Sequence, residues 1–322
     1  MKNEEHMLVL ANDLRRAISH LLEVRHSDRI ILTPGILAAL RILFAHLQIK
    51  RILLTSEEYY GESHFPGETV HVASCEAIPG LLQKRDFDVL LASPASWRGA
   101  RQPVEELFGW IRKTLGKRAP LLVADYAHAG SIGFPSVEEL AADVVCGDLE
   151  KWILPPDWNS RVAFLWFRTD RLFVKVAQAF RPFFLATESS NVSMLARWVD
   201  PADVRSVSGG LADLGVTRGQ LRDRHHVDMK LARDLASRLQ PSGVPETSIL
   251  WLEEDELGGE MIEDLEKLGL VWRIPGRGVR VLCRSDVVAG ATHGTARQGR
   301  QDDRAGSPSS ALTQLSPKTK SA

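Results

Sequence analysis

The chain has 322 residues, of which 44% are hydrophobic, and this is enough to bury one large core and a smaller second one. Its 40 lysines and arginines nearly balance 41 aspartates and glutamates, which disfavours nucleic acid and anionic membranes as partners. Neither a signal peptide nor a run of 18 apolar residues is found, so we expect a cytoplasmic protein with a small-molecule partner.

The first 168 residues alternate between helical patterns and short apolar runs. Helices are predicted over 7–25, 36–47, 103–115 and 136–142, and the break Thr33-Pro34-Gly35 ends the first strand. Strands are predicted at 29–32, 51–54, 69–73, 89–92, 121–124, 144–146 and 162–167. Strands that alternate with helices predict an α/β fold with a doubly wound, mostly parallel sheet.

After residue 168 the pattern changes to long amphipathic helices and a small α+β domain. The helix at 221–239 carries one apolar stripe, made of Leu221, Val227, Leu231, Leu235 and Leu239. A strand at 249–252, a helix at 259–268 and a strand at 278–283 follow. We therefore divide the chain into a large α/β domain with a short amino-terminal arm (1–205), a small α+β domain (206–289) and a tail too polar to fold (290–322).

Two apolar runs end in side chains that can do chemistry. The run 121–124 ends at Asp125, with His128 three residues on, and Lys151 closes a second run about two dozen residues later. Each has a structural alternative: a helix cap or ion pair for Asp125, a loop cap for His128 and a surface position for Lys151. If neighbouring strands bring them together, the lysine can form an imine with an aldehyde and the carboxylate can hold a pyridinium nitrogen.

These two segments, VADYAHAGSIG and GDLEKWILPP, resemble the aspartate and Schiff-base segments of the class V aminotransferase family. This family of fold-type I pyridoxal phosphate enzymes includes cysteine desulfurases and isopenicillin N epimerase. The resemblance implies that Lys151 forms the Schiff base, that Asp125 binds the pyridine nitrogen and that His128 contacts the ring oxygen. It also implies pyridoxal 5'-phosphate as the cofactor and a homodimer as the assembly.

Two amino-terminal segments add to the resemblance. ILTPGILAAL is similar to the loop and helix start where the family binds the cofactor's phosphate, which implies that Gly35 and Ile36 offer backbone amides. TSEEYYGES resembles the segment that stacks an aromatic ring on the cofactor, with Tyr59 the better candidate and Tyr60 the lesser one.

Two later segments match in the same order. SPASWRGARQPVEEL resembles a cofactor-binding stretch in which Ser96 replaces the usual asparagine. GRGVRVLCRSD resembles the terminal strand whose arginine pairs with the substrate carboxylate, which implies Arg280, with Arg273 as a second candidate. The resemblance covers residues 10 to 285, and its specificity is concentrated in the two central segments.

The chain departs from the family at the phosphate end of the site. Ile36, Asp148 and Glu150 stand where the family supplies hydroxyl or imidazole groups. A carboxylate about 4 Å from a phosphate costs on the order of 4 kcal/mol per charge pair at an effective dielectric constant near 20. Three outcomes are therefore open. The two acids point away from the phosphate, or an arginine such as Arg161 or one from a partner subunit compensates their charge, or the cofactor is held weakly or lost.

The cysteines bear on which reaction the chain catalyses. Cys75, Cys146 and Cys283 are scattered without metal-binding spacing, and none lies in the loop that carries the reactive cysteine of desulfurases. We therefore read them as small buried residues and disfavour desulfurase activity.

We interpret the chain as a cytoplasmic, homodimeric pyridoxal phosphate enzyme that acts on an amino acid or amine, with no metal, nucleic-acid or membrane partner. Amino-group transfer ranks above C–S or β/γ-elimination and above epimerisation, which use the same residues. A scaffold or regulatory protein that has lost catalysis is the alternative of another class. A nucleotide-binding enzyme is weaker, because no GxGxxG or Walker loop follows the first strand.

Overall fold

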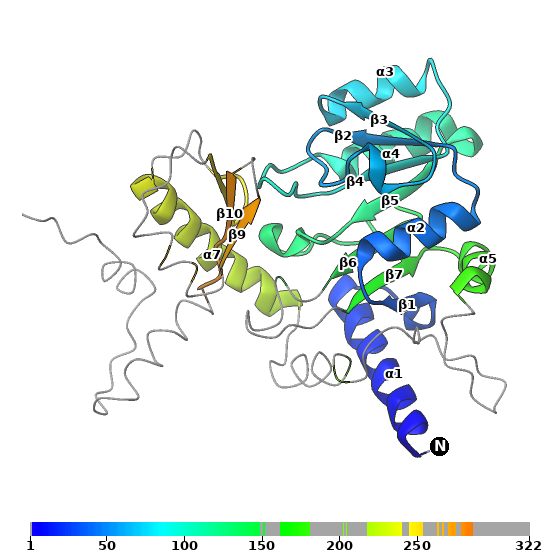
Figure 1. Cartoon of the computed structure of the whole chain (residues 1–322), viewed down its shortest axis with the longest axis horizontal. Coiled ribbons are helices and arrows are strands. Elements are labelled where there is room, and N and C mark those ends of the chain that lie inside the picture. Colours follow the sequence, from blue (N-terminus) through cyan, green and yellow to red (C-terminus); the bar gives the residue numbers. More distant parts are fainter. Residues whose placement is uncertain are drawn as a thin grey trace, which may run out of the picture.

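A computed structural model describes residues 2–148, 151, 162–180, 202, 204, 218–239, 245–253, 263, 266, 270–274 and 278–285. These residues form a seven-stranded sheet with flanking helices and a separate three-stranded sheet beside a long helix (Figure 1). The predicted tail, Glu150, Arg161 and most of the predicted helix 259–268 lie outside the described residues.

The large sheet is mostly parallel, as predicted. Its strands are β1 (Ile30–Thr33), β2 (Arg51–Thr55), β3 (Glu68–Val72), β4 (Val89–Ala92), β5 (Leu121–Asp125), β6 (Val144–Asp148) and β7 (Ala163–Phe167). They lie in the order β1-β7-β6-β5-β4-β2-β3. Strand β7 pairs antiparallel with both β6 and β1, so six strands run in one direction and β7 runs against them.

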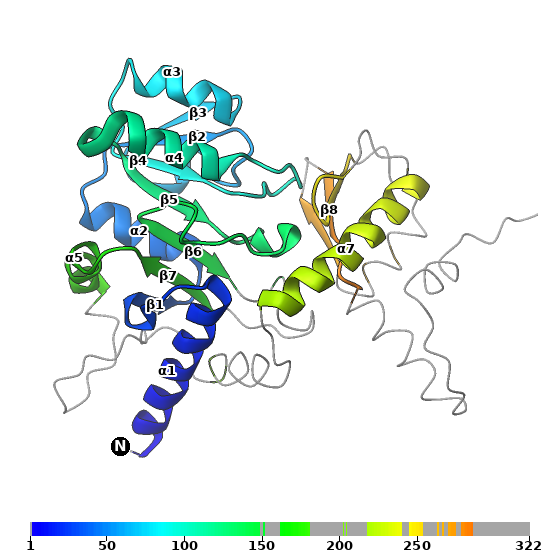
Figure 2. The same cartoon turned by 180° about the vertical axis from the view of Figure 1, so that it is seen from behind.

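Helices cover both faces of this sheet, which confirms the doubly wound arrangement. On one face lie α1 (Lys2–Leu22), α3 (Ile78–Leu82) and α4 (Val104–Leu115), and on the other lie α2 (Ile36–His46) and α5 (Asp170–Phe180) (Figure 2). Successive strand residues point to opposite faces, so Leu90 of β4 packs in the first core and Leu91 in the second. Both faces are buried, which explains the continuous apolar runs.

The predicted helix over 136–142 is wrong. Val137 and Leu140 are buried in the first core, as a helix face would be, but the segment forms turns rather than a helix. Ala141 has a φ of 55°, a left-handed conformation that a right-handed helix cannot include. The apolar residues of this segment have helical spacing because they are buried, and this spacing alone led to the prediction of a helix.

The small sheet consists of β8 (Ile249–Leu252), β9 (Val271–Ile274) and β10 (Gly278–Leu282), all antiparallel, with β10 in the centre. Helix α7 (Arg218–Leu239) packs Leu231 and Leu235 against it. The predicted stripe is wrong at Val227, which is 40% exposed, because the buried position next to it belongs to Asp228. Asp228 accepts hydrogen bonds from the backbone and hydroxyl of Ser285.

Among the described residues, no helix has the length and apolarity needed to cross a membrane.

Candidate active site

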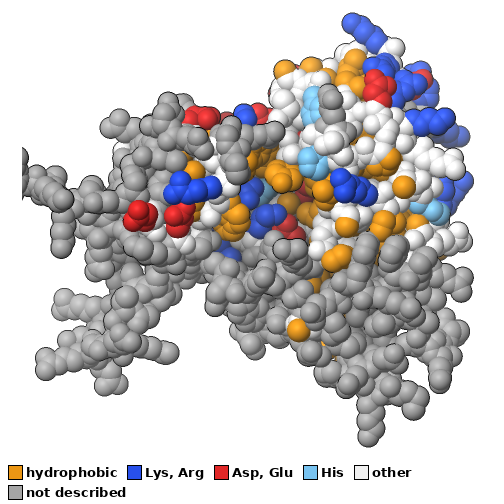
Figure 3. Space-filling view, in the orientation of Figure 1, with side chains coloured by type: hydrophobic (Ala, Val, Ile, Leu, Met, Phe, Trp, Pro, Cys, Tyr) orange, Lys and Arg blue, Asp and Glu red, His pale blue; other side chains and the backbone are white. Residues whose placement is uncertain are grey.

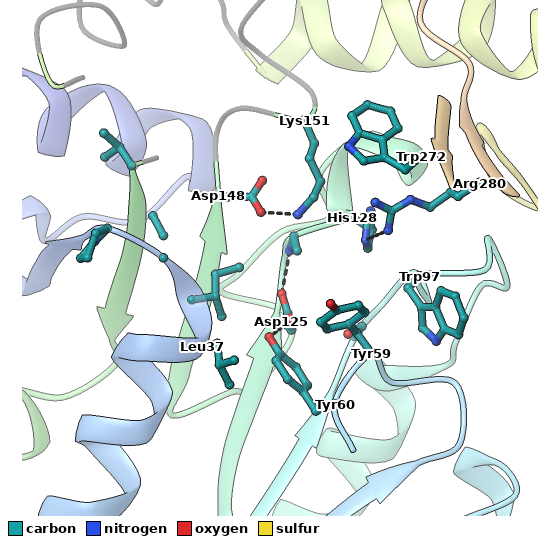
Figure 4. Close-up of a pocket in the computed structure, with 17 residues that line it drawn as sticks. Leu37, Tyr59, Tyr60, Trp97, Asp125, His128, Asp148, Lys151, Trp272 and Arg280 are labelled. Carbon is teal, nitrogen blue, oxygen red and sulfur yellow. Dashed lines mark hydrogen bonds and ion pairs between the residues drawn. The ribbon is translucent and has the colours of Figure 1, made fainter. Parts of the chain in front are cut away.

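A cavity of about 430 Å³ lies at the carboxyl edge of the large sheet. The segments that line it follow five parallel strands: β1, β2, β4, β5 and β6. The carboxyl ends of parallel strands meet at one edge, and this is where open α/β sheets hold their ligands. The space-filling view shows charged side chains between the two parts of the molecule (Figure 3). Val162 and Ala163 at the start of β7 also line the cavity. The small sheet contributes Trp272 and Arg280 (Figure 4).

Asp125 ends β5 and is 5% exposed. Its Oδ1 accepts a hydrogen bond of 2.8 Å from the amide of Ala127, and its Oδ2 accepts one of 2.5 Å from the hydroxyl of Tyr60. Burial raises the pKa of Asp125, whereas the two hydrogen bonds and the charge of Lys151 lower it. The carboxylate is thus held in one orientation on the wall of the cavity.

Lys151 lies three residues after β6, the neighbour of β5 in the sheet. The structure therefore places Lys151 and Asp125 on one cavity, as the two apolar runs suggested. The Nζ of Lys151 forms an ion pair with Oδ2 of Asp148, and both side chains are largely buried. The second oxygen of Asp148, Oδ1, is buried without a hydrogen-bond partner among the described residues.

His128 and Arg280, which also line the cavity, contact each other. The Nη1 of Arg280 lies 3.1 Å from the Nε2 of His128. Because a guanidinium can only donate, Nε2 must accept, which assigns the proton of a neutral imidazole to Nδ1. Burial and the charges of Arg280 and Lys151 hold the pKa of His128 well below its ordinary value. His128 is therefore neutral, and its Nδ1 is buried without a partner among the described residues.

Gly35, Ile36 and Tyr59 also lie on the cavity. Gly35 is the N-cap of α2 and has no side chain that could cap it, and the first turn of the helix holds no acidic residue. The first backbone amides of a helix have no partner within the helix and favour an anion. Tyr59 is 56% exposed, while Tyr60 is 5% exposed and lies next to Asp125.

Ser96 and Arg273, the other two predicted site residues, do not line the cavity. Ser96 is buried, and its hydroxyl accepts hydrogen bonds from the amides of Arg98 and Ala100, so it stabilises a turn. Arg273 pairs with Glu266 at 2.5 Å on an exposed surface. Successive residues of a strand face opposite ways, so Trp272 faces the cavity and its neighbour does not.

A buried acid behind the cavity was missed. Glu58 is 5% exposed and accepts hydrogen bonds from the amide and hydroxyl of Ser93 and from the side chain of Gln102. Burial raises its pKa to about 7. The sequence carries no clear signal for it, because Glu58 stands between another acid, Glu57, and the exposed Tyr59.

The sequence matches no protein-family model, and no curated protein is similar to it in sequence. Solved structures, in contrast, share its fold. Ureidoglycine–glyoxylate aminotransferase from Bacillus subtilis aligns over 96% of this chain and 89% of its own, with 14% identity and a TM-score of 0.63. The cysteine desulfurase CsdA from Escherichia coli aligns over 91% and 85%, with 14% identity and a TM-score of 0.61. A C-DES mutant with glycine covalently linked to the pyridoxal phosphate cofactor aligns over 91% and 86%, with 15% identity and a TM-score of 0.64. The resemblance to class V aminotransferase-like enzymes is thus confirmed at the level of the fold, which is that of fold-type I pyridoxal phosphate enzymes.

Proposed function

We propose that the chain is a pyridoxal phosphate-dependent enzyme that transfers the amino group of an amino acid or amine. One observation carries the proposal: a lysine amine and a buried carboxylate face one cavity from the carboxyl ends of adjacent strands. The shared fold with aminotransferases and cysteine desulfurases supports it.

The residues of the cavity fit this cofactor. Asp125 offers a fixed, buried acceptor to a pyridinium N–H. The Nδ1–H of His128, buried without a partner among the described residues, suits the ring oxygen. Tyr59 offers an aromatic face, and the start of α2 offers backbone amides to the phosphate. When bound, pyridoxal phosphate supplies an aldehyde and an electron-withdrawing ring.

Each polar residue of the cavity has a task in this proposal. Lys151 is the one amine among the described lining residues, so it attaches the cofactor and afterwards carries the Cα proton of the substrate. Asp125 keeps the ring nitrogen protonated by holding a negative charge next to it. Arg280 orients the substrate carboxylate.

The cavity offers fewer side-chain donors to the cofactor's phosphate than the family resemblance implies, but this does not exclude the cofactor. Ile36 removes a side-chain donor, yet its backbone amide at the start of α2 is unaffected by that change. Before the cofactor is attached, the charge of Asp148 is balanced by its ion pair with Lys151. We therefore expect the phosphate to be held mainly by backbone groups.

The cysteines favour transfer over desulfuration. All three are buried, and burial raises the pKa of each thiol, to about 12 for Cys75. A protonated, buried thiol is a poor nucleophile. Elimination and epimerisation remain the alternatives for this site, and assays for keto acid and ammonia separate them from transfer. A cytoplasmic homodimer is part of the proposal, together with an amino acid or amine as the partner.

Purified protein mixed with pyridoxal phosphate should gain a visible absorption band, and borohydride should fix the cofactor on Lys151. Lys151→Ala should lose both signals. Lys175→Ala, which removes an exposed lysine of α5, is the matched control and should retain them. No band at saturating cofactor would reject the proposal and favour a scaffold that has lost catalysis.

A further inference from the structure

Three aromatic residues, Tyr59, Trp97 and Trp272, line the side of the cavity nearest the small sheet, and we call them the aromatic wall. Tyr59 is 56% exposed and Trp272 is 36% exposed, and both are among the five large hydrophobic side chains of the described residues that are exposed. Figure 4 shows the three rings around the end of Arg280. Aromatic surface left in water at one cavity favours a ligand that covers it.

Trp272 and Arg280 are held together by strand register. They lie directly opposite each other in the antiparallel pair of β9 and β10. The guanidinium carbon of Arg280 is 5.6 Å from the centroid of the Trp272 ring. Opposite residues of such a pair have Cβ atoms about 5 Å apart, so the sheet itself sets the spacing between the cation and the ring.

Arg280 is a buried cation without an anionic partner in the described part of the chain. It is 7% exposed, its Nη1 contacts the neutral His128, and its Nε has no hydrogen bond. Asp148 influences its pKa from a distance but does not pair with it. A buried charge is costly unless an opposite charge meets it, so the site favours an anion at Arg280.

Trp97 is held in place by contacts with Trp251 and Arg98. Its ring lies 4.8 Å from that of Trp251, edge to face, and Arg98 lies over both rings, at 4.9 Å and 5.5 Å. Its edge-to-face contact with Tyr59, at 6.5 Å, brings Tyr59 into the same arrangement. A ring held in place loses little entropy when a ligand packs against it.

We propose that the preferred substrate is an amino acid with an aromatic side chain, whose carboxylate pairs with Arg280 and whose ring packs against the aromatic wall. The substrate class rests on the proposed function, because amine chemistry is what makes the ligand an amino acid. Trp272 is then the residue that determines specificity, because Tyr59 is shared with the cofactor in the proposed function. An aliphatic amino acid would leave the ring of Trp272 partly in water.

The test measures binding without cofactor, by isothermal titration calorimetry. The probes are 3-phenylpropanoate, its neutral amide 3-phenylpropanamide, and butanoate, which keeps the carboxylate and lacks the ring. We expect 3-phenylpropanoate to bind about tenfold tighter than either, a difference of about 1.4 kcal/mol. Equal affinity for butanoate and 3-phenylpropanoate would overturn the proposal.

Substitutions test which residues cause the preference for 3-phenylpropanoate over butanoate. Trp272→Ala should weaken 3-phenylpropanoate about tenfold and leave butanoate nearly unchanged, whereas Trp272→Phe should keep the preference. Tyr59→Ala tests the same wall independently if Trp272→Ala unfolds. Val227→Ala, an exposed apolar position on α7 away from the cavity, is the control and should change neither affinity. Retention of the preference in both alanine variants would also overturn the proposal.

The two proposals fail separately. Ring preference in calorimetry without a cofactor adduct would keep the aromatic wall and reject the cofactor. A cofactor adduct on Lys151 without a preference for 3-phenylpropanoate would keep the cofactor and reject the aromatic wall.

Discussion

The hydroxyl of Tyr60 donates a 2.5 Å hydrogen bond to the buried carboxylate of Asp125. The two residues come from different strand ends, after β2 and at the end of β5, with β4 between them in the sheet. Burial raises the pKa of Asp125 overall, and the hydrogen bond from Tyr60 lowers it, so Tyr60 favours the charged form of the acid that a pyridinium nitrogen needs.

Tyr60→Phe should therefore lower the free energy of unfolding by roughly 1 to 3 kcal/mol, since it leaves a buried acceptor without its donor. It should also weaken binding of pyridoxal phosphate. Urea unfolding and cofactor titration measure these effects. Tyr59→Phe removes the hydroxyl of the exposed neighbour, keeps its ring and is the control for the unfolding measurement. If the two variants unfold alike, the bond does not stabilise the protein.

Glu58 should make stability depend on pH. Its pKa rises from 4.5 to about 7 on folding, so between these values the folded protein binds more protons than the unfolded chain. The contribution of Glu58 is thus fully present below about pH 4.5 and falls as pH rises toward 7, by at most about 3 kcal/mol. Glu58→Gln should remove this slope in unfolding curves measured from pH 4.5 to 7.5. An unchanged slope in the variant would mean that other groups cause it.

Asp148 should disfavour the phosphate group. Asp148→Asn removes a negative charge from the cavity, so we expect it to raise the affinity for pyridoxal phosphate about tenfold relative to phosphate-free pyridoxal. The ratio of the two affinities is the measured quantity, because the broken ion pair with Lys151 affects both ligands equally. Asp13→Asn, at an exposed position on α1, is the control. A ratio that stays constant would place the phosphate away from Asp148.

Gly99 should be essential for the contact between the segment after β4 and β8. It has a φ of 91°, and a Cβ there would lie 2.5 Å from the backbone oxygen of Ile249. Its own carbonyl accepts a hydrogen bond from Thr247. Gly99→Ala should therefore cost more than about 2 kcal/mol of unfolding free energy. Gly109→Ala, inside α4 with open space at the Cβ position, should instead stabilise the protein slightly.

The sequence was sufficient to predict the mostly parallel sheet and the presence of Asp125 and Lys151 at one edge of it. Both follow from apolar runs that end in polar residues, because consecutive parallel strands place such ends at one edge. The antiparallel direction of β7 could not be read in the same way, since a strand buried on both faces is apolar whichever way it runs.

The sequence is less informative where one residue decides which way a side chain faces. Arg273 is the second candidate for the substrate carboxylate by resemblance, and strand alternation turns Trp272 rather than Arg273 toward the cavity. On α7, Asp228 is buried next to the exposed Val227, where it pairs with Arg224 of the same helix and accepts hydrogen bonds from Ser285, 57 residues later in the sequence. Partners at such separations are visible only once the chain has folded.

The lysine and the arginine of the cavity belong to different sheets: Lys151 follows β6 of the large one, and Arg280 lies in β10 of the small one. In the proposed function, the residue that binds the aldehyde and the residue that binds the substrate carboxylate are therefore encoded in separate stretches of the gene. Substitutions in β8, β9 and β10 can then change which acid is preferred and leave Lys151 and its strand unaltered.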